Sequence, residues 1–193
     1  MINIILFGPP GAGKGTQSAK IIEKYSLVHI ATGDLFRKHL KEGTPLGNLA
    51  KDYMNKGNLV PDQVVIDMVD DKIKTSGQAS GIIFDGFPRT IPQAQALDNL
   101  LTGKGTPIKV LIELVVPEDE LRTRLADRAL KENRPDDAKP EVIENRIAVY
   151  KGETAAVAEY YKKAGKYSSV FGVGEIDNIF SNICREIDKS LLL

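Results

Sequence analysis

The chain has 193 residues, enough to bury one sizeable core, so we expect a single domain with insertions rather than two independent domains. Its 26 basic residues balance its 26 acidic residues, and this composition does not favour a nucleic-acid or membrane partner. No apolar run approaches the roughly 18 residues of a membrane span, and the single cysteine, Cys184, cannot form an internal disulfide. These features predict a location in the cytoplasm or another reducing compartment.

The first half of the chain alternates apolar runs with helical patterns. It opens with a mostly apolar run of strand length, as expected of a parallel strand that is covered on both faces. The predicted elements are a strand at 2–7, a helix at 14–25, a strand at 28–30, helical segments at 35–40 and 45–54, a loop at 55–61 and a helix at 62–74.

The second half continues the alternation, and its next strand ends on the carboxylate of Asp85. We predict strands at 81–85, 109–115 and 167–173, helices at 90–101, 118–130 and 141–163, and a last helix from 175. The apolar and aromatic positions of the 141–163 helix are spaced alternately four and three residues apart, which indicates a stripe facing the core.

Five strands that alternate with helices predict a doubly wound α/β fold with a five-stranded parallel sheet. We expect a core of residues 1–30, 61–128 and 140–193, interrupted by a helical insertion at 31–60 and a short polar segment at 129–139. Both interruptions should lie over the carboxyl edge of the sheet, where α/β folds bind ligands.

The stretch Gly8 to Thr16, with the sequence Gly-Pro-Pro-Gly-Ala-Gly-Lys-Gly-Thr, follows the first predicted strand directly and opens a helix. Backbone N–H groups at such a helix start converge on an anion, and Lys14 adds a charge for the β- and γ-phosphates. The spacing fits the P-loop rule, but position 15 is Gly, and the hydroxyl comes one place later at Thr16. We therefore expect a metal held mainly by phosphates and water.

Four arginines bracket the polar segment and are candidates for binding a transferring phosphoryl group. Arg124 and Arg128 lie one helical turn apart, Arg134 lies in the segment, and Arg146 lies on the next helix. Such a transfer relies on positioning and positive charge. The alternative is a simple surface ion pair, such as Arg124 with Glu120 at i,i+4; Arg122 projects away from the others and is interpreted as solvated surface.

Several polar residues have two interpretations. Asp85 ends a buried strand, from which a carboxylate can hold Mg²⁺ and its waters beside the P-loop, or it is a turn residue. Gln93 either reads a base or completes a capping box with Thr90. His29 and His39 have no partners at metal-ligand spacing and are expected in core and surface positions.

Five separated motifs, in this order, resemble those of the adenylate kinase family, and the resemblance runs from Met1 to the last helix. They are Gly8 to Thr16, Thr32-Gly33-Asp34 with Arg37, Gly57-Asn58-Leu59-Val60-Pro61, Asp85 to Gln93, and Arg124 with Arg128. The form Gly-Lys-Gly-Thr is usual for that family, which accounts for Gly15.

The resemblance implies a P-loop kinase fold in which residues 31–60 bind the nucleoside monophosphate and 129–139 form a short ATP lid. The implied AMP site comprises Thr32, Arg37, Asn58, Leu59, Val60, Gly86, Phe87, Pro88, Arg89, Gln93, Arg134 and Arg146. The implied ATP site comprises Gly11, Ala12, Gly13, Lys14, Gly15, Thr16, Arg128 and Gly174. The implied catalytic groups are Lys14, Arg89, Arg124, Arg128, Arg134 and Arg146, with Asp85 holding Mg²⁺ through water.

The expected activity is the reversible, Mg²⁺-dependent transfer of the ATP γ-phosphoryl group to AMP, giving two ADP. The longer lids of the family sometimes carry a zinc-binding cysteine cluster, and one cysteine argues against structural zinc here. ATP and AMP are the expected partners of a chain that acts as a monomer. The alternatives are a UMP or CMP kinase of the same family and a non-catalytic nucleotide switch. A GTP switch should carry Asn-Lys-x-Asp, and the near match at 55–58 lacks the Asp and lies too early.

Overall fold

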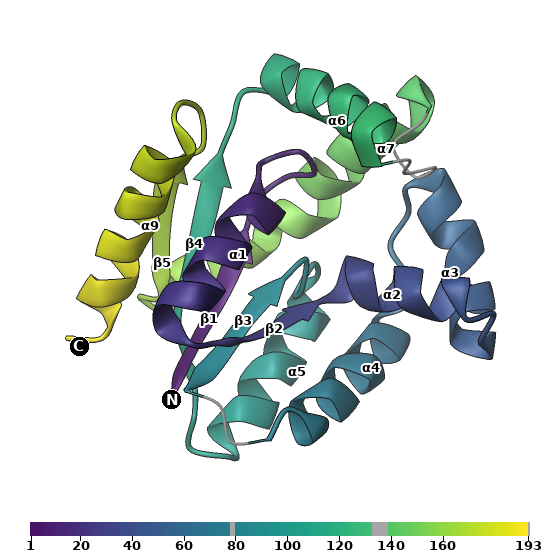
Figure 1. Ribbon diagram of the computed structural model, residues 1–193. Helices are drawn as coiled ribbons and strands as arrows, with labels where there is room; N and C mark the ends of the chain where they lie inside the picture. The colour runs from purple at the N-terminus through teal and green to yellow at the C-terminus, as the bar shows by residue number, and fades with distance from the viewer. Residues whose placement is uncertain (78–79, 133–138, 193) are drawn as a thin grey trace.

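The computed structural model of the protein describes residues 1–77, 80–132 and 139–192. Its centre is a parallel sheet of five strands in the order β2-β3-β1-β4-β5, seen in Figure 1. The strands are β1 (Ile2–Phe7), β2 (Val28–Ala31), β3 (Gly81–Asp85), β4 (Ile108–Val115) and β5 (Tyr167–Phe171). The predicted five-stranded α/β fold is confirmed.

Strand β1 occupies the middle of the sheet and is buried on both faces, as its mostly apolar sequence predicts; its one polar residue, Asn3, is buried and accepts from the Ile82 N–H at 3.0 Å. Ile4, Ile5 and Leu6 are each about 1% exposed. Leu6 pairs with Asp85 on β3, and Phe7 pairs with Glu113 on β4. The register therefore brings the carboxyl ends of these strands to one edge, at the point where the chain connections diverge to opposite sides of β1.

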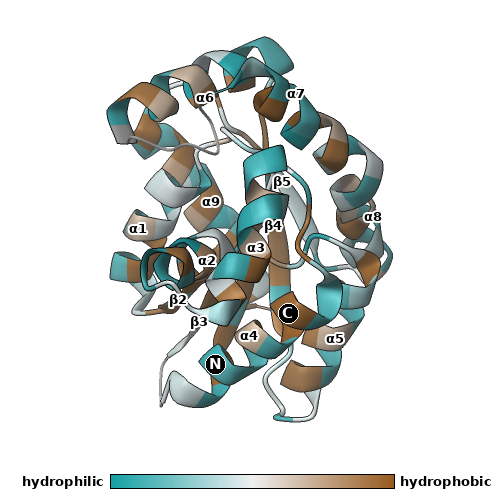
Figure 2. Cartoon of the chain, turned by 90° about the vertical axis from the view of Figure 1, so that its right-hand side faces the viewer, coloured by the Kyte–Doolittle hydropathy of each residue, from teal (hydrophilic) through white to brown (hydrophobic). Residues whose placement is uncertain are grey.

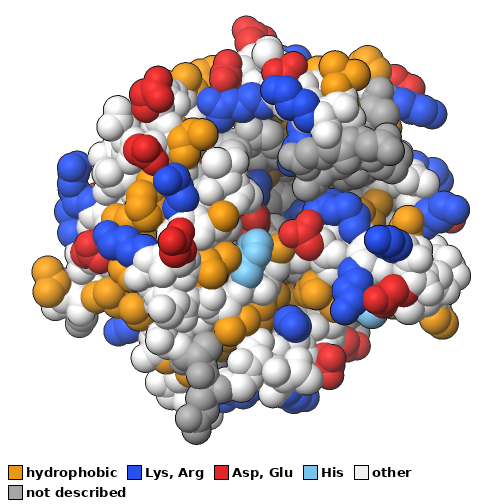
Figure 3. Space-filling model, viewed as in Figure 1, with side chains coloured by type: hydrophobic (Ala, Val, Ile, Leu, Met, Phe, Trp, Pro, Cys, Tyr) orange, Lys and Arg blue, Asp and Glu red, His pale blue; other side chains and the backbone are white. Residues whose placement is uncertain are grey.

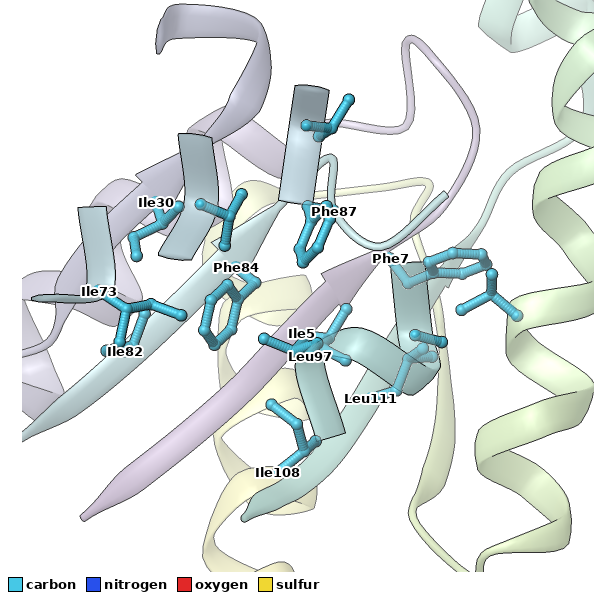
Figure 4. Close-up of a cluster of buried hydrophobic side chains, with 14 of the residues drawn as sticks. Ile5, Phe7, Ile30, Ile73, Ile82, Phe84, Phe87, Leu97, Ile108 and Leu111 are labelled. Atoms are coloured by element: carbon cyan, nitrogen blue, oxygen red, sulfur yellow. The ribbon is translucent and has the colours of Figure 1, made fainter. Parts of the chain in front are cut away.

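Helices cover both faces of the sheet. Helices α1 (Lys14–Tyr25) and α9 (Ile176–Ser190) pack on one face, against residues such as Ile4 and Ile112. Helices α4 (Asp62–Thr75), α5 (Ile91–Thr102) and α8 (Ala155–Lys163) pack on the other, where Ile5, Phe84 and Leu97 meet (Figure 4). Hydrophobic residues gather along the strands and hydrophilic ones on the outer sides of the helices (Figure 2).

Helices α2 (Thr32–Lys41) and α3 (Pro45–Lys56) form a hairpin that projects beyond the sheet (Figure 1). Helix α2 begins at Thr32, earlier than the predicted residue 35, because Asp34 in the first turn stabilises the positive end of the helix dipole despite Gly33. The Thr44 hydroxyl caps α3 by accepting from the N–H of Gly47 at 3.1 Å. A Cβ at Gly47 would lie 2.3 Å from the His39 carbonyl oxygen, so glycine permits this close crossing.

The spacing predicted one continuous helix at 141–163, and this prediction is wrong. The segment consists of α7 (Pro140–Val149), a π-helical turn η2 (Tyr150–Thr154) and α8. Helix α6 (Glu118–Glu132) lies before the polar stretch. The wider turn holds Gly152, which weakens regular helix, and begins at Tyr150, whose hydroxyl donates to Glu113 Oε1 at 2.8 Å. Anchoring Tyr150 on β4 favours the extra residue in this turn.

Within the parts of the chain that the structure describes, no helix combines the length and the apolar character needed to cross a bilayer.

Candidate active site

The loop between β1 and α1 lies tightly against its neighbours. Gly8 has φ +140 and Gly11 has φ +84, and side chains there would meet the carbonyl oxygens of Leu114 and Leu121 at 2.9 and 3.0 Å. Glycine at these positions lets the loop approach β4 and α6 closely, with its end opening into α1 at Lys14. The geometry is that of a backbone anion cradle at the N-terminus of a helix.

Lys14 lies at the centre of a buried, positively charged region. Its Nζ donates to the carbonyl oxygens of Gly8 at 2.8 Å and Pro9 at 3.0 Å. Burial lowers the pKa of Lys14 to about 8; the Asp85 charge opposes this shift, and the charges of Arg89, Arg146 and Arg128 add to it. Three of the predicted arginines therefore lie near enough to act on this lysine.

A cavity extends from Lys14 to the α2–α3 hairpin and is closed on its other side by α7 and η2. Figure 3 shows this side of the molecule hollowed below α6, with Lys and Arg side chains gathered around the hollow. The predicted site residues that line the cavity are Lys14, Thr32, Arg37, Asn58, Leu59, Val60, Gly86, Pro88, Arg89, Gln93 and Arg146.

The turn after β3 joins two cavity residues through one carbonyl group. The Gly86 carbonyl oxygen accepts from Thr32 Oγ1 at 2.7 Å and from Arg89 Nε at 2.8 Å. Gly86 has φ +72, and a Cβ there would lie 3.0 Å from the Arg89 guanidinium. The backbone of the turn therefore orients Arg89.

Gln93 forms part of its predicted helix cap and also lies at the cavity wall. Its side chain lines the cavity but is almost fully buried, with Oε1 accepting from the Arg89 N–H at 2.8 Å. Its Nε2 donates to Asp62 Oδ1 at 2.7 Å, and its own N–H donates to the Thr90 hydroxyl at 3.3 Å. The capping interaction is present, and the amide is held at the cavity wall.

Asp85 projects from the end of β3 beside the loop and stays ionised. Burial alone would raise the pKa of its carboxyl group, but His29 and the charges of Lys14 and Arg89 outweigh burial and hold that pKa below its usual range. Ser18 Oγ lies 3.5 Å and His29 Nε2 lies 3.7 Å from its Oδ2. His29, predicted to be a core residue, thus borders the site.

The carboxylate of Asp85 fits a magnesium ion that is bound mainly by phosphates and water. Mg²⁺ in phosphoryl-transfer sites usually keeps several waters and takes one or two protein carboxylates. Across residues 1–77, 80–132 and 139–192, no three His, Cys, Asp or Glu side chains form a metal-binding group, so an all-protein metal cage is not part of the described structure.

The arginines of the polar segment differ in their surroundings. Arg124 Nε donates to Glu120 at 2.7 Å and its Nη1 donates to the Gly172 carbonyl at 3.0 Å, so the predicted i,i+4 alternative is present. Arg128 is half-buried on α6. Arg134 lies outside the described residues. Arg122 bridges Glu118, Asp119 and Glu144 on the surface.

Other predicted residues surround the cavity or lie behind it. Phe87 is a core residue, 1% exposed, with its ring centroid 6.5 Å from that of Phe84. Among the described residues, the cavity lining does not include Gly11, Ala12, Gly13, Gly15, Thr16, Arg128 or Gly174. Of these, Gly11, Gly13 and Gly174 have positive φ angles.

Two lining residues, Tyr150 and Thr154, were assigned by spacing to the core stripe alone. Tyr150 packs on Phe7, with ring centroids 5.7 Å apart, and shares Glu113 with Tyr167, whose hydroxyl donates at 2.7 Å. Burial and the Glu113 charge raise the pKa of Tyr150. The hydroxyl groups of Tyr150 and Thr154, within a stripe that is otherwise mostly apolar, were the sequence feature that could have indicated a partly polar wall of the cavity.

A phosphate loop at the central strand, with arginines on both sides of one cavity beneath a helical hairpin, defines a P-loop nucleoside monophosphate kinase. The family model described as adenylate kinase matches residues 6–166. The chain belongs to the adenylate kinase family.

Curated proteins named adenylate kinase are similar over nearly their whole length. The protein of Bacteroides fragilis is 47% identical over 188 residues, which cover 97% of this chain and 99% of the relative. The protein of Parabacteroides distasonis is 48% identical, covering 98% and 99% of the two chains. That of Methanothrix thermoacetophila is 41% identical, covering 97% and 99%.

Proposed function

We propose that the chain transfers the γ-phosphoryl group of ATP to AMP, reversibly, giving two ADP. The observation that carries this proposal is one cavity lined by Lys14 of the phosphate loop and by Arg37, Arg89 and Arg146 around the α2–α3 hairpin. A donor held on the loop and an acceptor held under the hairpin would then face one another. The relatives named adenylate kinase support AMP as the acceptor.

On the donor side, backbone N–H groups of the loop hold the ATP phosphates, with Lys14 as the central charge. The residues proposed for this side are Gly11, Ala12, Gly13, Lys14, Gly15, Thr16, Arg128 and Gly174. Arg124 and Arg134 are proposed as further charges on the phosphates. Arg124 forms an ion pair with Glu120, so binding to the phosphates requires that Arg124 leave this ion pair or share its guanidinium group between Glu120 and the phosphates.

On the acceptor side, Arg37 and Arg89 hold the AMP phosphate, and Arg146 reaches it from α7. Thr32, Gln93 and the backbone of Asn58 to Val60 surround the nucleoside, with the turn residues Gly86, Phe87 and Pro88 behind. We propose residues 31–60 as the insertion that binds AMP and 129–139 as the short lid.

The chemistry needs charge and alignment more than proton transfer. An AMP phosphate oxygen is already anionic and attacks the γ-phosphorus of ATP, and the bond to the bridging oxygen of ADP breaks. Arg89, Arg146 and Lys14 stabilise the negative charge spread over the transferred oxygens. When bound with ATP, Mg²⁺ supplies further charge neutralisation, and Asp85 would hold it through water. No general base is assigned.

A coupled assay with AMP, UMP, CMP and GMP as acceptors tests the proposal. Phosphorylation of AMP at a kcat/KM well above those of the other three is expected. A preference for UMP or CMP would identify the pyrimidine kinase alternative, and nucleotide binding without turnover would identify the switch. The monomeric state and cytoplasmic location stay predictions.

The ionisation of Lys14 predicts a pH dependence for ATP use. The protonated form binds phosphates, and a pKa lowered to about 8 means that the free enzyme loses this charge earlier than an ordinary lysine would. We expect kcat/KM for ATP to fall about tenfold for each pH unit above that pKa. The fall in kcat at saturating ATP should begin at a higher pH than the fall in kcat/KM, because bound phosphates favour the protonated amine. A kcat/KM profile that stays flat to pH 10 would contradict the assignment.

A further inference from the structure

We propose that Asn145 is a positioning residue for the acceptor: it docks the loop after α3 onto helix α7 and so sets the geometry of the AMP pocket. This inference rests on the proposed acceptor site. Asn145 is not among the residues that line the cavity, so it acts through its neighbours rather than on the substrate.

The Asn145 side chain joins segments that lie almost 90 positions apart in the sequence. Its Nδ2 donates to the Lys56 carbonyl oxygen at 2.7 Å and to Asn58 Oδ1 at 2.8 Å. Lys56 ends α3, and its carbonyl group is one of those that a helix leaves without an internal partner. Asn145 therefore caps the C-terminus of α3 from another helix.

The chemistry of the contact requires an amide. Both partners are acceptors, and the NH₂ group of Asn145 has two hydrogens, one for each of them. This pattern also fixes which end of the side chain faces the loop. An aspartate of the same shape would bring a carboxylate against two oxygens and donate to neither.

The same junction is tightly packed beside Asn145. Gly57 is buried with φ +75, and a Cβ there would lie 2.8 Å from Arg146 Cγ and 3.0 Å from the Val142 carbonyl oxygen. The loop backbone thus rests directly on α7. The hydrogen bonds of Asn145 and the glycine contact together define how far α3 stands from α7.

This junction connects the two walls of the cavity. Gly57, Asn58, Leu59 and Val60 line one wall, while Arg146, Val149, Tyr150 and Thr154 line the facing wall. If AMP binds the docked arrangement, its apparent affinity scales with the fraction of molecules in which the loop is docked. Loss of the Asn145 contacts would lower that fraction without removing any group that touches AMP.

The test replaces Asn145 in the full chain, with Asn145→Asp and Asn145→Ala compared with the control Asn99→Asp. Asn99 is an exposed helical asparagine on α5 and undergoes the same change from amide to carboxylate. We expect KM for AMP to rise about five- to tenfold in both Asn145 variants, with kcat and KM for ATP within about twofold of the unaltered protein. The control should keep all three values.

Amide hydrogen exchange gives a readout that does not depend on turnover. The N–H groups of Gly57 and Asn58 donate to carbonyl oxygens of α3 at 3.0 and 2.9 Å. Their exchange should quicken in the Asn145 variants while exchange in the sheet is unchanged. An unchanged KM for AMP would overturn the inference, as would an equal rise in both KM values with a general fall in Tm. Failure of the unaltered chain to phosphorylate AMP would instead refute the proposed function.

Discussion

Replacing Arg89 with alanine is expected to lower kcat by roughly 10³-fold. Arg89 lines the cavity near Lys14, and its charge acts on both Lys14 and Asp85. Its Nε donates to the Gly86 carbonyl oxygen, so the turn after β3 sets the orientation of the guanidinium group. Such a preorganised cation stabilises charge that develops during transfer, and alanine cannot replace it.

The fold should survive this change. The Gly86 carbonyl keeps its hydrogen bond from the Thr32 hydroxyl, and Gln93 still accepts from the backbone N–H of residue 89. Steady-state kinetics should be measured beside thermal unfolding, with Arg185→Ala, an exposed arginine on α9, as the matched control. A folded Arg89→Ala protein with near-normal turnover would refute the assigned role.

The features predicted well from the sequence are those encoded locally. The mostly apolar run at 2–7 indicates a strand covered on both faces, and its one polar residue, Asn3, is buried with its side chain accepting from the Ile82 N–H. The conformation of the loop from Gly8 to Lys14 is likewise encoded locally, because its positive φ angles and its close approach to β4 and α6 require glycine. These patterns were sufficient to locate the phosphate loop at the end of the first strand, whereas the order of the strands was not predicted.

Features that depend on distant contacts were not accessible in this way. Spacing predicted a continuous helix through Tyr150, while the bond from its hydroxyl to Glu113 on β4 accompanies the π-helical turn. Whether Arg124 pairs with Glu120 or faces ATP depends on competition between partners, and spacing allows both. Asn145 had no local signal, since its partners lie at the end of α3 and in the loop that follows it, almost 90 positions away.

Gln93 shows why a motif does not assign one role to each side chain. Only half of the predicted capping box is formed: the Thr90 hydroxyl accepts from the Gln93 N–H, but Gln93 Oε1 accepts from the N–H of Arg89 rather than from that of Thr90, and Nε2 donates to Asp62. A buried amide that is hydrogen-bonded through both its oxygen and its nitrogen is held in one orientation. Gln93 therefore links the start of α5 to the wall of the cavity.

Replacing Lys14 with methionine is expected to lower kcat/KM for ATP by roughly 10³-fold or more. Methionine fills a similar volume but carries no charge, so the loop keeps its shape while the phosphates lose their central cation. The amine donates to Gly8 and Pro9, two carbonyl groups of the loop itself. These contacts hold Nζ inside the cradle, and ATP has only to exchange them for phosphate oxygens.

The stability of this variant should change in the opposite direction. Burial of Lys14 among Arg89, Arg128 and Arg146 disfavours its charge, which is why its pKa is lowered, so removing the charge relieves repulsion in the free protein. We expect Tm to hold or rise while kcat/KM for ATP falls. Lys20→Met, on the same helix and paired with Asp177 at the surface, is the control and should keep its activity. A Lys14→Met protein that uses ATP normally would show that the backbone of the loop binds the phosphates without help from this lysine, and the charge cluster around it would then need another explanation.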